Sequence, residues 1–326
     1  MKNAIIGLGT IGKVHAKVLG LQEKGITALC DIDVAAAERI KGEYAPDAAV
    51  YTDWKQMLDE VQPEVVHICT PHYLHAEMVI EALGRGINVL CEKPLCIRKE
   101  DIGRILEAEK NSTAQLGVCQ QNRYLETNAF VKDYLSDKTV VGAHGTVAWN
   151  RDEKYYNSGE WRGTQALEGG GVLINQALHT LDIVQWLCGM PNEVIAIKDN
   201  FTLRDVIEVE DTITARFFGE TPFSFFATNA SPCTYPVQVN LTLSNKERIT
   251  ILPDMLMING EIKIKGRQMR TLGKACYGVG HEPLIEDFYD CVATGRHFMI
   301  DGQEAMKVVR LILAAYESNG ERISVN

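Results

Sequence analysis

Long apolar stretches are missing from this sequence: it has no run of about 18 apolar residues, the length that a membrane-spanning helix needs. The first residues, MKNAIIGLGTIG, hold only a short apolar segment that glycines interrupt, and they show no signal-peptide cleavage site. We therefore expect a protein that neither spans a membrane nor is secreted, and we place it in the cytoplasm.

Closely spaced cysteines are also absent. The nine cysteines are an odd number, scattered and without a Cys-x-x-Cys pair, so we expect reduced residues of a core, as in cytosolic proteins. The eight histidines show no metal-ligand spacing either. His72 and His75 follow a proline and are more simply explained as part of a loop that lines a cofactor site, so we expect no metal.

Basic residues are fewer than acidic residues in this sequence. Lys and Arg number 33 against 43 Asp and Glu, which gives a net charge of −10 at neutral pH. This field repels phosphate backbones and anionic lipid surfaces. We expect no nucleic-acid partner and no membrane partner, whereas a small anionic ligand stays compatible because local amides or one lysine can outweigh a distant net charge.

Repeats, low-complexity tracts and linkers rich in Pro, Gly or Ser are absent as well. The length of 326 residues is about twice that of a typical single domain and predicts two domains. A content of 46% hydrophobic and 23% charged residues is that of a globular chain and excludes disorder as the main state. We expect two closely packed domains with a ligand site where they meet.

The first 122 residues alternate short apolar strands with amphipathic helices. Strands are expected at residues 3–9, 26–33, 63–70, 87–94 and 114–120, and helices at 11–23, 34–42, 75–84 and 100–110. Buried strands that alternate with helices are typical of a doubly wound parallel sheet. The prediction is an α/β Rossmann domain over residues 1–122.

From residue 123 to 326 the pattern changes to longer alternating strands with few helices between them. Strands are expected at 146–151, 211–218, 222–230 and 236–244, and helices at 172–187 and 303–317. This pattern predicts an α+β domain with a large, open, mostly antiparallel sheet. The C-terminal helix 303–317 could pack back on the first domain.

A glycine motif of the form G-x-G-x-x-G follows the first strand and precedes a helix, which is the context of a dinucleotide-binding turn. Gly7 would make the tight turn, Gly9 would let backbone amides reach a pyrophosphate, and Gly12 would let the helix pack on the strand. The motif residues expected at the cofactor are Gly7, Gly9, Thr10, Ile11 and Gly12. His15, one turn into the helix, is expected to contact a neighbouring loop.

Asp31 ends the second strand, where a carboxylate would accept hydrogen bonds from the adenosine ribose. Asp33 follows closely and no arginine is adjacent, so a 2′-phosphate would meet two carboxylates. NAD is therefore favoured over NADP. The alternative is a glycine turn with a helix-capping Asp31 and no nucleotide.

Two further segments follow strands at the carboxyl edge of the predicted sheet, where ligands bind in open α/β folds. Lys93 follows the fourth strand and would be half desolvated, with Pro94 directing it toward the crevice, so it is a candidate for proton transfer. The alternative is an ordinary solvated lysine. Other expected cofactor residues at this edge are Thr70, Pro71, His75, Glu92 and Gln121.

The predicted helix 172–187 contains a narrow polar stripe. Asn175, His179, Asp182 and Trp186 fall at i, i+4, i+7 and i+11 among apolar residues. A lone histidine in a helix is more often structural, but in this company His179 is a candidate general base, with Asn175 one turn away to hold the substrate or the imidazole. The three glycines 169–171 before the helix would permit another chain or a ligand to come close.

These blocks, taken in order, resemble the Gfo/Idh/MocA oxidoreductases, the group that contains glucose-fructose oxidoreductase and inositol 2-dehydrogenase. The resemblance covers nearly the whole chain through GLGTIGKVHA, CTPHYLHAE, CEKPL, QNRY, WRGTQALEGGGVLINQALHTLDIVQWLCG and GHEPLIEDFYDCVATGR. It is specific for fold and cofactor and much less so for substrate. It implies a dinucleotide-binding domain and a second domain whose sheet often makes subunit contacts, hence a homodimer or homotetramer.

The resemblance also implies roles for residues. Lys93 matches the lysine that lies beside the nicotinamide and takes part in proton relay, and His179 matches the usual acid/base. Asn175 stands where many sugar and polyol enzymes of the family have Asp. Candidate substrate contacts, with surface or packing roles as the alternative, are Arg123 with its neighbour Tyr124, Arg162, Tyr155 and Tyr156.

The function expected from this match is hydride transfer between a secondary alcohol of a sugar, sugar derivative or cyclic polyol and NAD. His179 would remove the hydroxyl proton while Lys93 stabilises the developing alkoxide. Two alternatives stay open: an NAD-dependent glycoside hydrolase that oxidises its substrate transiently, and a non-catalytic NAD-binding regulator.

Overall fold

The computed structural model describes residues 1–266 and 279–325, and the chain divides into two compact units. The first unit contains Met1–Gln121 and Arg270–Met306, and the second contains Asn122–Met269 and Lys307–Asn326. The segment that returns to the first unit near the C-terminus lies within the range that the sequence assigned to the second domain. In the described part of the chain no helix is long and apolar enough to cross a membrane.

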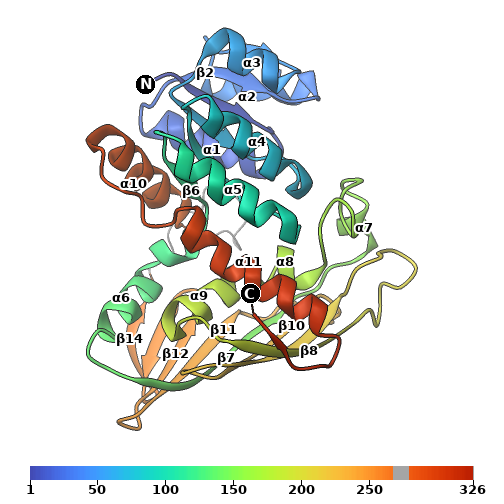
Figure 1. The fold of residues 1–326 in the computed structure, drawn as a ribbon, viewed down its shortest axis with the longest axis vertical. Coiled ribbons are helices and arrows are strands. Elements are labelled where there is room, and N and C mark those ends of the chain that lie inside the picture. Colours follow the sequence, from blue (N-terminus) through green and yellow to red (C-terminus); the bar gives the residue numbers. More distant parts are fainter. Residues whose placement is uncertain (267–278, 326) are drawn as a thin grey trace. The chain divides into compact units, whose positions relative to one another are not determined.

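The first unit is built on a parallel sheet with the strand order β3-β2-β1-β4-β5-β6. In Figure 1 the part formed by residues 1–121 runs from blue to green. Its strands are β1 (Asn3–Ile6), β2 (Ile26–Cys30), β3 (Ala49–Tyr51), β4 (Val65–Ile68), β5 (Asn88–Cys91) and β6 (Leu116–Val118). The order reverses between β1 and β4, which is the switch point where such sheets bind ligands. The predicted doubly wound sheet is therefore confirmed, and only the short β3 was not predicted.

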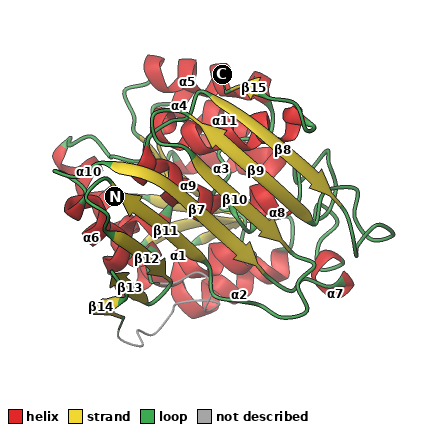
Figure 2. Ribbon diagram, turned by 90° about the horizontal axis from the view of Figure 1, so that it is seen from below, coloured by secondary structure: helices red, strands yellow, loops and turns green. Residues whose placement is uncertain are grey.

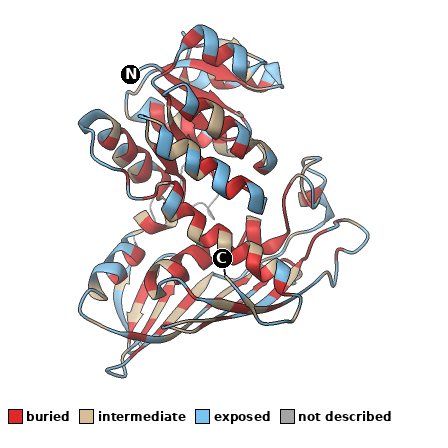
Figure 3. Ribbon diagram, in the orientation of Figure 1, coloured by how far each residue is buried: buried red, intermediate tan, exposed pale blue. Residues whose placement is uncertain are grey.

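Helices flank this sheet and bury their apolar sides on it (Figure 3). They are α1 (Thr10–Leu21), α2 (Val34–Tyr44), α3 (Trp54–Val61), α4 (His75–Gly84), α5 (Lys99–Asn111) and α10 (His281–Thr294), with a short 3₁₀ turn η1 (His72–Leu74). Asp33 and Asp53 cap α2 and α3 by accepting hydrogen bonds from two backbone amides each. Helix α10 was not predicted, although Pro283 in its first turn is a typical helix-start residue.

The second unit is built on a mostly antiparallel sheet, as predicted. Its strand order is β14-β13-β12-β11-β7-β10-β9-β8-β15. Only β7 and β10 pair in parallel among its described strands. The strands are β7 (Val140–Ala148), β8 (Glu193–Asp199), β9 (Thr212–Phe218), β10 (Phe223–Thr228), β11 (Gln238–Leu243), β12 (Arg248–Leu252), β13 (Met255–Ile258), β14 (Glu261–Lys265) and β15 (Ile323–Ser324). Figure 2 shows β8, β9, β10 and β7 side by side.

Strand β7 begins six residues before the predicted strand 146–151. Glycines at 142 and 145 weaken a strand pattern in the sequence, but the packing explains one of them. A Cβ on Gly145 would lie 2.7 Å from the ring of Phe225. The glycine is thus needed for close packing between the strands and does not end β7.

The helices of the second unit pack on this sheet. They are α6 (Glu126–Tyr134), α7 (Glu153–Tyr156), α8 (Val172–Asn175), α9 (Leu178–Cys188) and the later part of α11 (Gly302–Ser318), preceded by the 3₁₀ turn η2 (Gln121–Tyr124). Helix α9 lies over β7, β10 and β11. Eight cysteines in the described residues are free thiols; Cys233 is exposed rather than in the core, and Cys276 lies outside the described residues.

The prediction of a single helix over residues 172–187 is wrong in one respect: the helix is interrupted between α8 and α9. The amides of Gln176 and Ala177 both donate to the carbonyl of Val172, at 3.1 and 2.9 Å, so the turn widens before Leu178 restarts the helix. The apolar pattern continues through the break and gives no sign of it. Asn175 and His179 consequently lie on two helices and not one turn apart on the same one.

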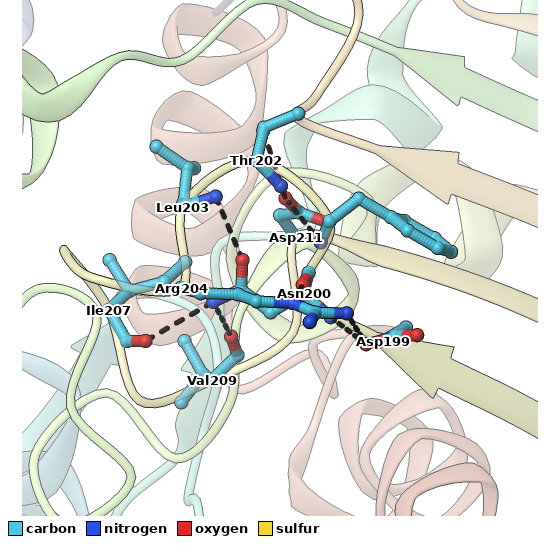
Figure 4. A network of polar contacts seen from close by, with 9 residues as sticks. Asp199, Asn200, Thr202, Leu203, Arg204, Ile207, Val209 and Asp211 are labelled. Carbon is cyan, nitrogen blue, oxygen red and sulfur yellow. Dashed lines mark hydrogen bonds and ion pairs between the residues drawn. The ribbon is translucent and has the colours of Figure 1, made fainter.

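The loop after β8 is held together by polar contacts within itself (Figure 4). The buried carboxylate of Asp211 accepts hydrogen bonds from the amides of Phe201 and Thr202, and the Asn200 amide donates to the carbonyls of Ile207 and Val209. These hydrogen bonds fix the conformation of the loop, which contains no helix or strand.

Near the end of that loop, the buried Glu210 accepts hydrogen bonds from the amides of Gly171 and Leu173, at the start of α8, and from the hydroxyl of Tyr316. A Cβ on Gly170 would lie 2.3 Å from the Tyr316 hydroxyl. The glycines 169–171 were predicted to let another chain or a ligand come close; in the structure Tyr316 of the same chain lies against Gly170.

A buried ion pair joins η2 to α9. The guanidinium of Arg123 donates from Nε and Nη2 to the two carboxylate oxygens of Asp182, at 2.8 and 2.6 Å. The same guanidinium lies 5.2 Å from the ring centre of Trp186. Both charged groups are almost fully buried, so each depends on the other for solvation.

Removing one charge of this pair should destabilise the fold strongly. We expect Asp182→Asn to lower the free energy of unfolding by about 3–5 kcal/mol, because it leaves the Arg123 charge uncompensated in the interior. Glu193→Gln, which breaks the exposed pair with Arg322, is the control and should cost less than about 1 kcal/mol. Urea denaturation of both variants measures the difference, and equal losses would contradict this account.

Candidate functional site

Two of the three glycines in the motif of the first unit are tightly packed against neighbouring backbone. Gly7 has a φ of +87°, and a Cβ there would lie 2.7 Å from the carbonyl carbon of Cys69. A Cβ on Gly12 would lie 2.0 Å from the carbonyl oxygen of Gly7. Around Gly9, by contrast, nothing lies within 4 Å of an added Cβ. The turn therefore packs against the end of β4 and leaves open space at Gly9, which suits a pyrophosphate.

Asp31 fixes the shape of this turn from the end of β2. One carboxylate oxygen accepts a hydrogen bond from the amide of Leu8, and the other accepts from the amide of Asp33 at 2.8 Å. Thr10 and Ile11, also predicted at the cofactor, form the first turn of α1. A carboxylate held beside the glycine turn, with Asp33 two residues on, fits ribose hydroxyls and disfavours an added phosphate.

The segments after β4 and β5 are joined through one buried histidine. The two ring nitrogens of His75 lie 2.7 Å from the carbonyl oxygen of Pro94 and 2.8 Å from that of Thr70. Burial lowers the pKa of His75, so its ring is neutral and donates to only one of these two carbonyls. The ring lies between Thr70 of one segment and Pro94 of the next; Pro71 follows Thr70, and Glu92 and Lys93 precede Pro94. Gln121, also buried, follows β6. The structure gathers these predicted residues at the carboxyl ends of three neighbouring strands.

Glu92 is buried together with three histidines. His15 and His281 approach one of its carboxylate oxygens through their Nε2 atoms, at 3.0 and 3.3 Å. Burial alone would raise the pKa of Glu92, but these hydrogen bonds hold its pKa well below the usual range. The ring of His67 lies against that of His15, and burial lowers the pKa of both of these histidines. His15 therefore does contact a neighbouring segment, as expected.

In the second unit, Asn175 lies among polar side chains from three segments. Its side-chain amide donates to a carboxylate oxygen of Glu168 and lies 3.4 Å from the hydroxyl of Tyr155. That hydroxyl accepts hydrogen bonds from Gln176 at 2.9 Å and from Arg162 at 2.7 Å, which occupy its two lone pairs. The contact with Glu168 orients the Asn175 amide within this cluster.

His179 is the second residue of α9 and is half-buried. It belongs to the second unit, whereas Lys93 belongs to the first. The polar stripe predicted around it is only partly present: Asp182 is fully buried and bound to Arg123. The break before Leu178 separates Asn175 from the other three stripe residues, which all lie on α9.

The other predicted substrate contacts lie in different surroundings. The guanidinium of Arg123 donates from Nε and Nη2 to the carboxylate of Asp182. Tyr156 is buried in a cluster with Leu203, Ile207 and Val209, and its hydroxyl accepts a hydrogen bond from Asn229 at 2.9 Å. The surroundings of Arg123 and Tyr156 match the packing roles given as the alternative in the sequence analysis. Among the predicted substrate contacts, Arg162 and Tyr155 share the polar cluster with Asn175.

Glu168 is the site residue that the sequence analysis missed. Its side chain is buried, with one carboxylate oxygen on the Asn175 amide and the other on the backbone amide of Gly163. The only signal was an acidic residue directly before three glycines, at the start of an apolar segment where a carboxylate needs hydrogen-bond partners.

One group of potential metal ligands occurs in the described residues: His15, Glu92 and His281, whose ligand atoms lie within 4.8 Å of one another. The same atoms already form the hydrogen bonds described above. The fourth side chain near them is Cys119, whose sulfur lies 3.8 Å from His15 Nε2.

Two of the glycines make a matched test of the cofactor turn. We expect Gly9→Ala to keep the thermal stability of the wild type but to weaken NAD binding at least about tenfold, because its methyl group would occupy the open space. Gly12→Ala should instead lower the melting temperature, since its Cβ would collide with the Gly7 carbonyl. Thermal denaturation and calorimetric titration with NAD measure both, and unchanged NAD affinity in Gly9→Ala would exclude this position for the pyrophosphate.

The buried neutral histidines predict acid sensitivity. Because burial lowers the pKa of His15 and His67 in the fold, unfolding lets them bind protons below the ordinary value of 6.5. Stability should be complete above that pH and fall as the pH drops toward 5, by up to about 1.4 kcal/mol per pH unit for each histidine. His67→Asn should make this slope shallower in urea denaturation, whereas the exposed His297→Asn should not. Identical slopes in all three proteins would contradict the assignment.

Comparison with protein families identifies the chain. The family model for "Oxidoreductase family, NAD-binding Rossmann fold" matches residues 1–120, and the model for "GFO/IDH/MocA C-terminal domain" matches residues 139–245. Together they cover more than half of the sequence.

Among curated relatives, inositol 2-dehydrogenase of Salmonella typhimurium is 28% identical over 197 residues, which is 57% of this chain and 54% of that protein. The 2,7-anhydro-N-acetylneuraminate hydratase of Mediterraneibacter gnavus is 28% identical over 201 residues, or 60% and 52%. The chain thus spans about half the length of the curated relatives it matches.

Among solved structures, the WlbA dehydrogenase of Bordetella pertussis in complex with NADH and UDP-GlcNAcA has a TM-score of 0.86 at 24% identity, covering 100% of this chain and 98% of the other. That likeness shows the shared fold over both units. With both family models matched, the chain belongs to the Gfo/Idh/MocA oxidoreductase family and has an NAD-binding Rossmann domain.

Proposed function

We propose that this protein is an NAD-dependent oxidoreductase that transfers a hydride between a secondary alcohol of a sugar, sugar derivative or cyclic polyol and the nicotinamide. The observation that supports it most is the glycine turn, packed at Gly7 and Gly12, open at Gly9 and braced by Asp31, in a domain of this family. When bound, NAD supplies the hydride acceptor.

His179 is the proposed general base. Its imidazole removes the hydroxyl proton of the substrate as the hydride leaves the adjacent carbon. Lys93 is proposed to bind the same oxygen and to stabilise the alkoxide charge as it develops. An imidazole titrates near neutral pH, and an ammonium group remains charged there, so the two groups divide proton removal from charge stabilisation.

The polar cluster of the second unit supports a substrate with several hydroxyl groups. The neutral amide of Asn175 is oriented by Glu168 and lies beside Tyr155, and the guanidinium of Arg162 belongs to the same cluster. Amides and guanidinium groups are the side chains that hydroxyls of sugars bind in pairs. Glu168 acts in this proposal as the carboxylate that orients Asn175, in the absence of an acidic residue at 175 itself.

A second candidate is a reaction in which oxidation is only transient. It is favoured by the relative named a hydratase, since addition of water involves no net oxidation. The same His179 and Lys93 would serve it, because the hydride would return to the substrate at the end of each cycle. An NAD-dependent glycoside hydrolase belongs to the same class.

We further propose a cytoplasmic homo-oligomer. Support for the compartment comes from the free thiols of the described cysteines. Support for the assembly comes from apolar side chains exposed on strands of the large sheet: Val141, Ile197 and Phe226.

Absorbance of reduced nicotinamide tests the function. Inositols, aldoses, amino sugars and their acids should be screened with NAD and with NADP. We expect reduction of NAD by at least one compound of this panel. In His179→Ala and Lys93→Met, kcat should fall by about 10²–10⁴-fold with NAD binding retained. His297→Ala, an exposed histidine, is the control.

Full activity in either variant would overturn the assigned roles. Release of phenol from aryl glycosides by the protein with bound NAD, without NADH accumulation, would favour the transient-oxidation candidate. Absence of both activities, with NAD binding retained, would support a non-catalytic regulator instead.

A further inference from the structure

The buried carboxylate of Glu92 stands directly before Lys93 and receives hydrogen bonds from two helices. Its Oε1 lies 3.0 Å from Nε2 of His15 in α1 and 3.3 Å from Nε2 of His281 in α10. Its Oε2 accepts a hydrogen bond from the backbone amide of Lys93 at 3.3 Å. All of these residues belong to the first unit. Glu92 is only 5% exposed, so its charge is compensated by these donors and not by water.

The direction of every hydrogen bond beyond Glu92 follows from its charge. An ionised carboxylate only accepts, so Nε2 of His15 must bear a proton. Since burial lowers the pKa of His15, the ring is neutral and its Nδ1 is an acceptor. That Nδ1 lies 2.7 Å from Nδ1 of His67, so His67 must donate from Nδ1.

The chain continues to a tyrosine on α10. With its proton on Nδ1, His67 accepts at Nε2, and the hydroxyl of Tyr289 lies 3.0 Å from that atom. Burial raises the pKa of Tyr289, so its hydroxyl keeps the proton that it donates. The chain therefore runs one way, from the Tyr289 hydroxyl through His67 and His15 to Glu92, and each donor has one acceptor.

We propose that Tyr289, His67 and His15 are positioning residues for Lys93. They fix the Glu92 carboxylate in one place and one orientation, and through the Lys93 amide they fix the backbone from which the lysine side chain extends. His75 holds the other side of the same segment through Pro94. This inference rests on the proposed role of Lys93, but the direction of the chain does not.

The chief alternative for the same side chains is a metal site. His15, Glu92, His281 and Cys119 offer a nitrogen, oxygen and sulfur set of the kind that zinc binds. A metal on Nε2 of His15 would need its lone pair, so the proton of His15 would move to Nδ1 and that of His67 to Nε2. The two arrangements thus differ in the tautomer of both rings.

Nitrogen-15 NMR of histidine-labelled protein distinguishes them, because protonated and unprotonated ring nitrogens have different chemical shifts. We expect His15 to carry its proton on Nε2 and His67 on Nδ1, with spectra of His15→Gln and His67→Gln as assignments. Zinc added to the protein should leave both signals unchanged. The reverse tautomers, a doubly protonated His15, or a zinc-dependent change at both rings would overturn the proposal.

Tyr289→Phe tests the effect at the far end of the chain, where only one hydroxyl is removed. We expect kcat to fall at least about tenfold, with the KM for substrate and the affinity for NAD little changed, and the His67 signals to shift. Tyr134→Phe removes a tyrosine hydroxyl bonded to Glu247 at the surface of the second unit and should change neither. Unchanged kcat and His67 signals in Tyr289→Phe would overturn the positioning role.

The proposed function and this inference fail in different ways. If Lys93→Met keeps full activity, the role of Lys93 is wrong, whatever the tautomers are. If Lys93→Met is inactive but Tyr289→Phe is as active as the wild type, Lys93 acts without the buried chain. His67→Asn serves as a second variant, because its tautomer effect on His15 can be read from the NMR spectrum even where activity is lost through lower stability.

Discussion

One buried negative charge, that of Glu92, organises the first unit. A carboxylate in a protein interior is tolerated only when donors surround it, and here they come from α1, from α10 and from the backbone of Lys93. The requirement for donors therefore holds a late segment of the chain, α10, against the first helix. In our proposal the position of Lys93 depends on the same group of contacts.

The second unit uses buried carboxylates in a similar way. Glu210 accepts from the backbone at the start of α8, Asp211 closes the loop after β8, Asp182 binds Arg123, and Glu168 orients Asn175. Glu210 and Asp211 accept from backbone amides that lie outside regular helix or strand hydrogen bonding, whereas Asp182 and Glu168 orient polar side chains. The irregular segments around α8 are ordered by these contacts rather than by helix or strand propensity.

The sequence predicted the parts of the fold that repeat a local pattern. Buried strands, amphipathic helices and the glycine turn each have a period or a fixed spacing, so the parallel sheet and the cofactor turn could be located. The break between α8 and α9 could not, because the apolar residues on both sides continue one helical pattern while the Val172 carbonyl accepts two amides. Strand β7 was placed too late because Gly145 looks like a strand breaker until Phe225 is seen beside it.

The buried contacts were beyond prediction for a different reason. His15 and Glu92 are 77 residues apart, Glu92 and His281 are 189 apart, and His67 and Tyr289 are 222 apart. No local spacing connects them, and each histidine taken alone resembles an ordinary core residue. Glu168 was missed although its partners Gly163 and Asn175 are near in sequence, because the irregular backbone between them follows no helix or strand period.

The three glycines of the cofactor turn are required for different reasons. Gly7 and Gly12 are demanded by the polypeptide itself, which has no room for a side chain at either place, whereas the chain alone would accept alanine at Gly9. In a lineage that gave up its nucleotide, mutation would reach Gly9 first and leave the other two intact. The residue at this one position thus serves as a record of whether natural selection still acts on the ligand.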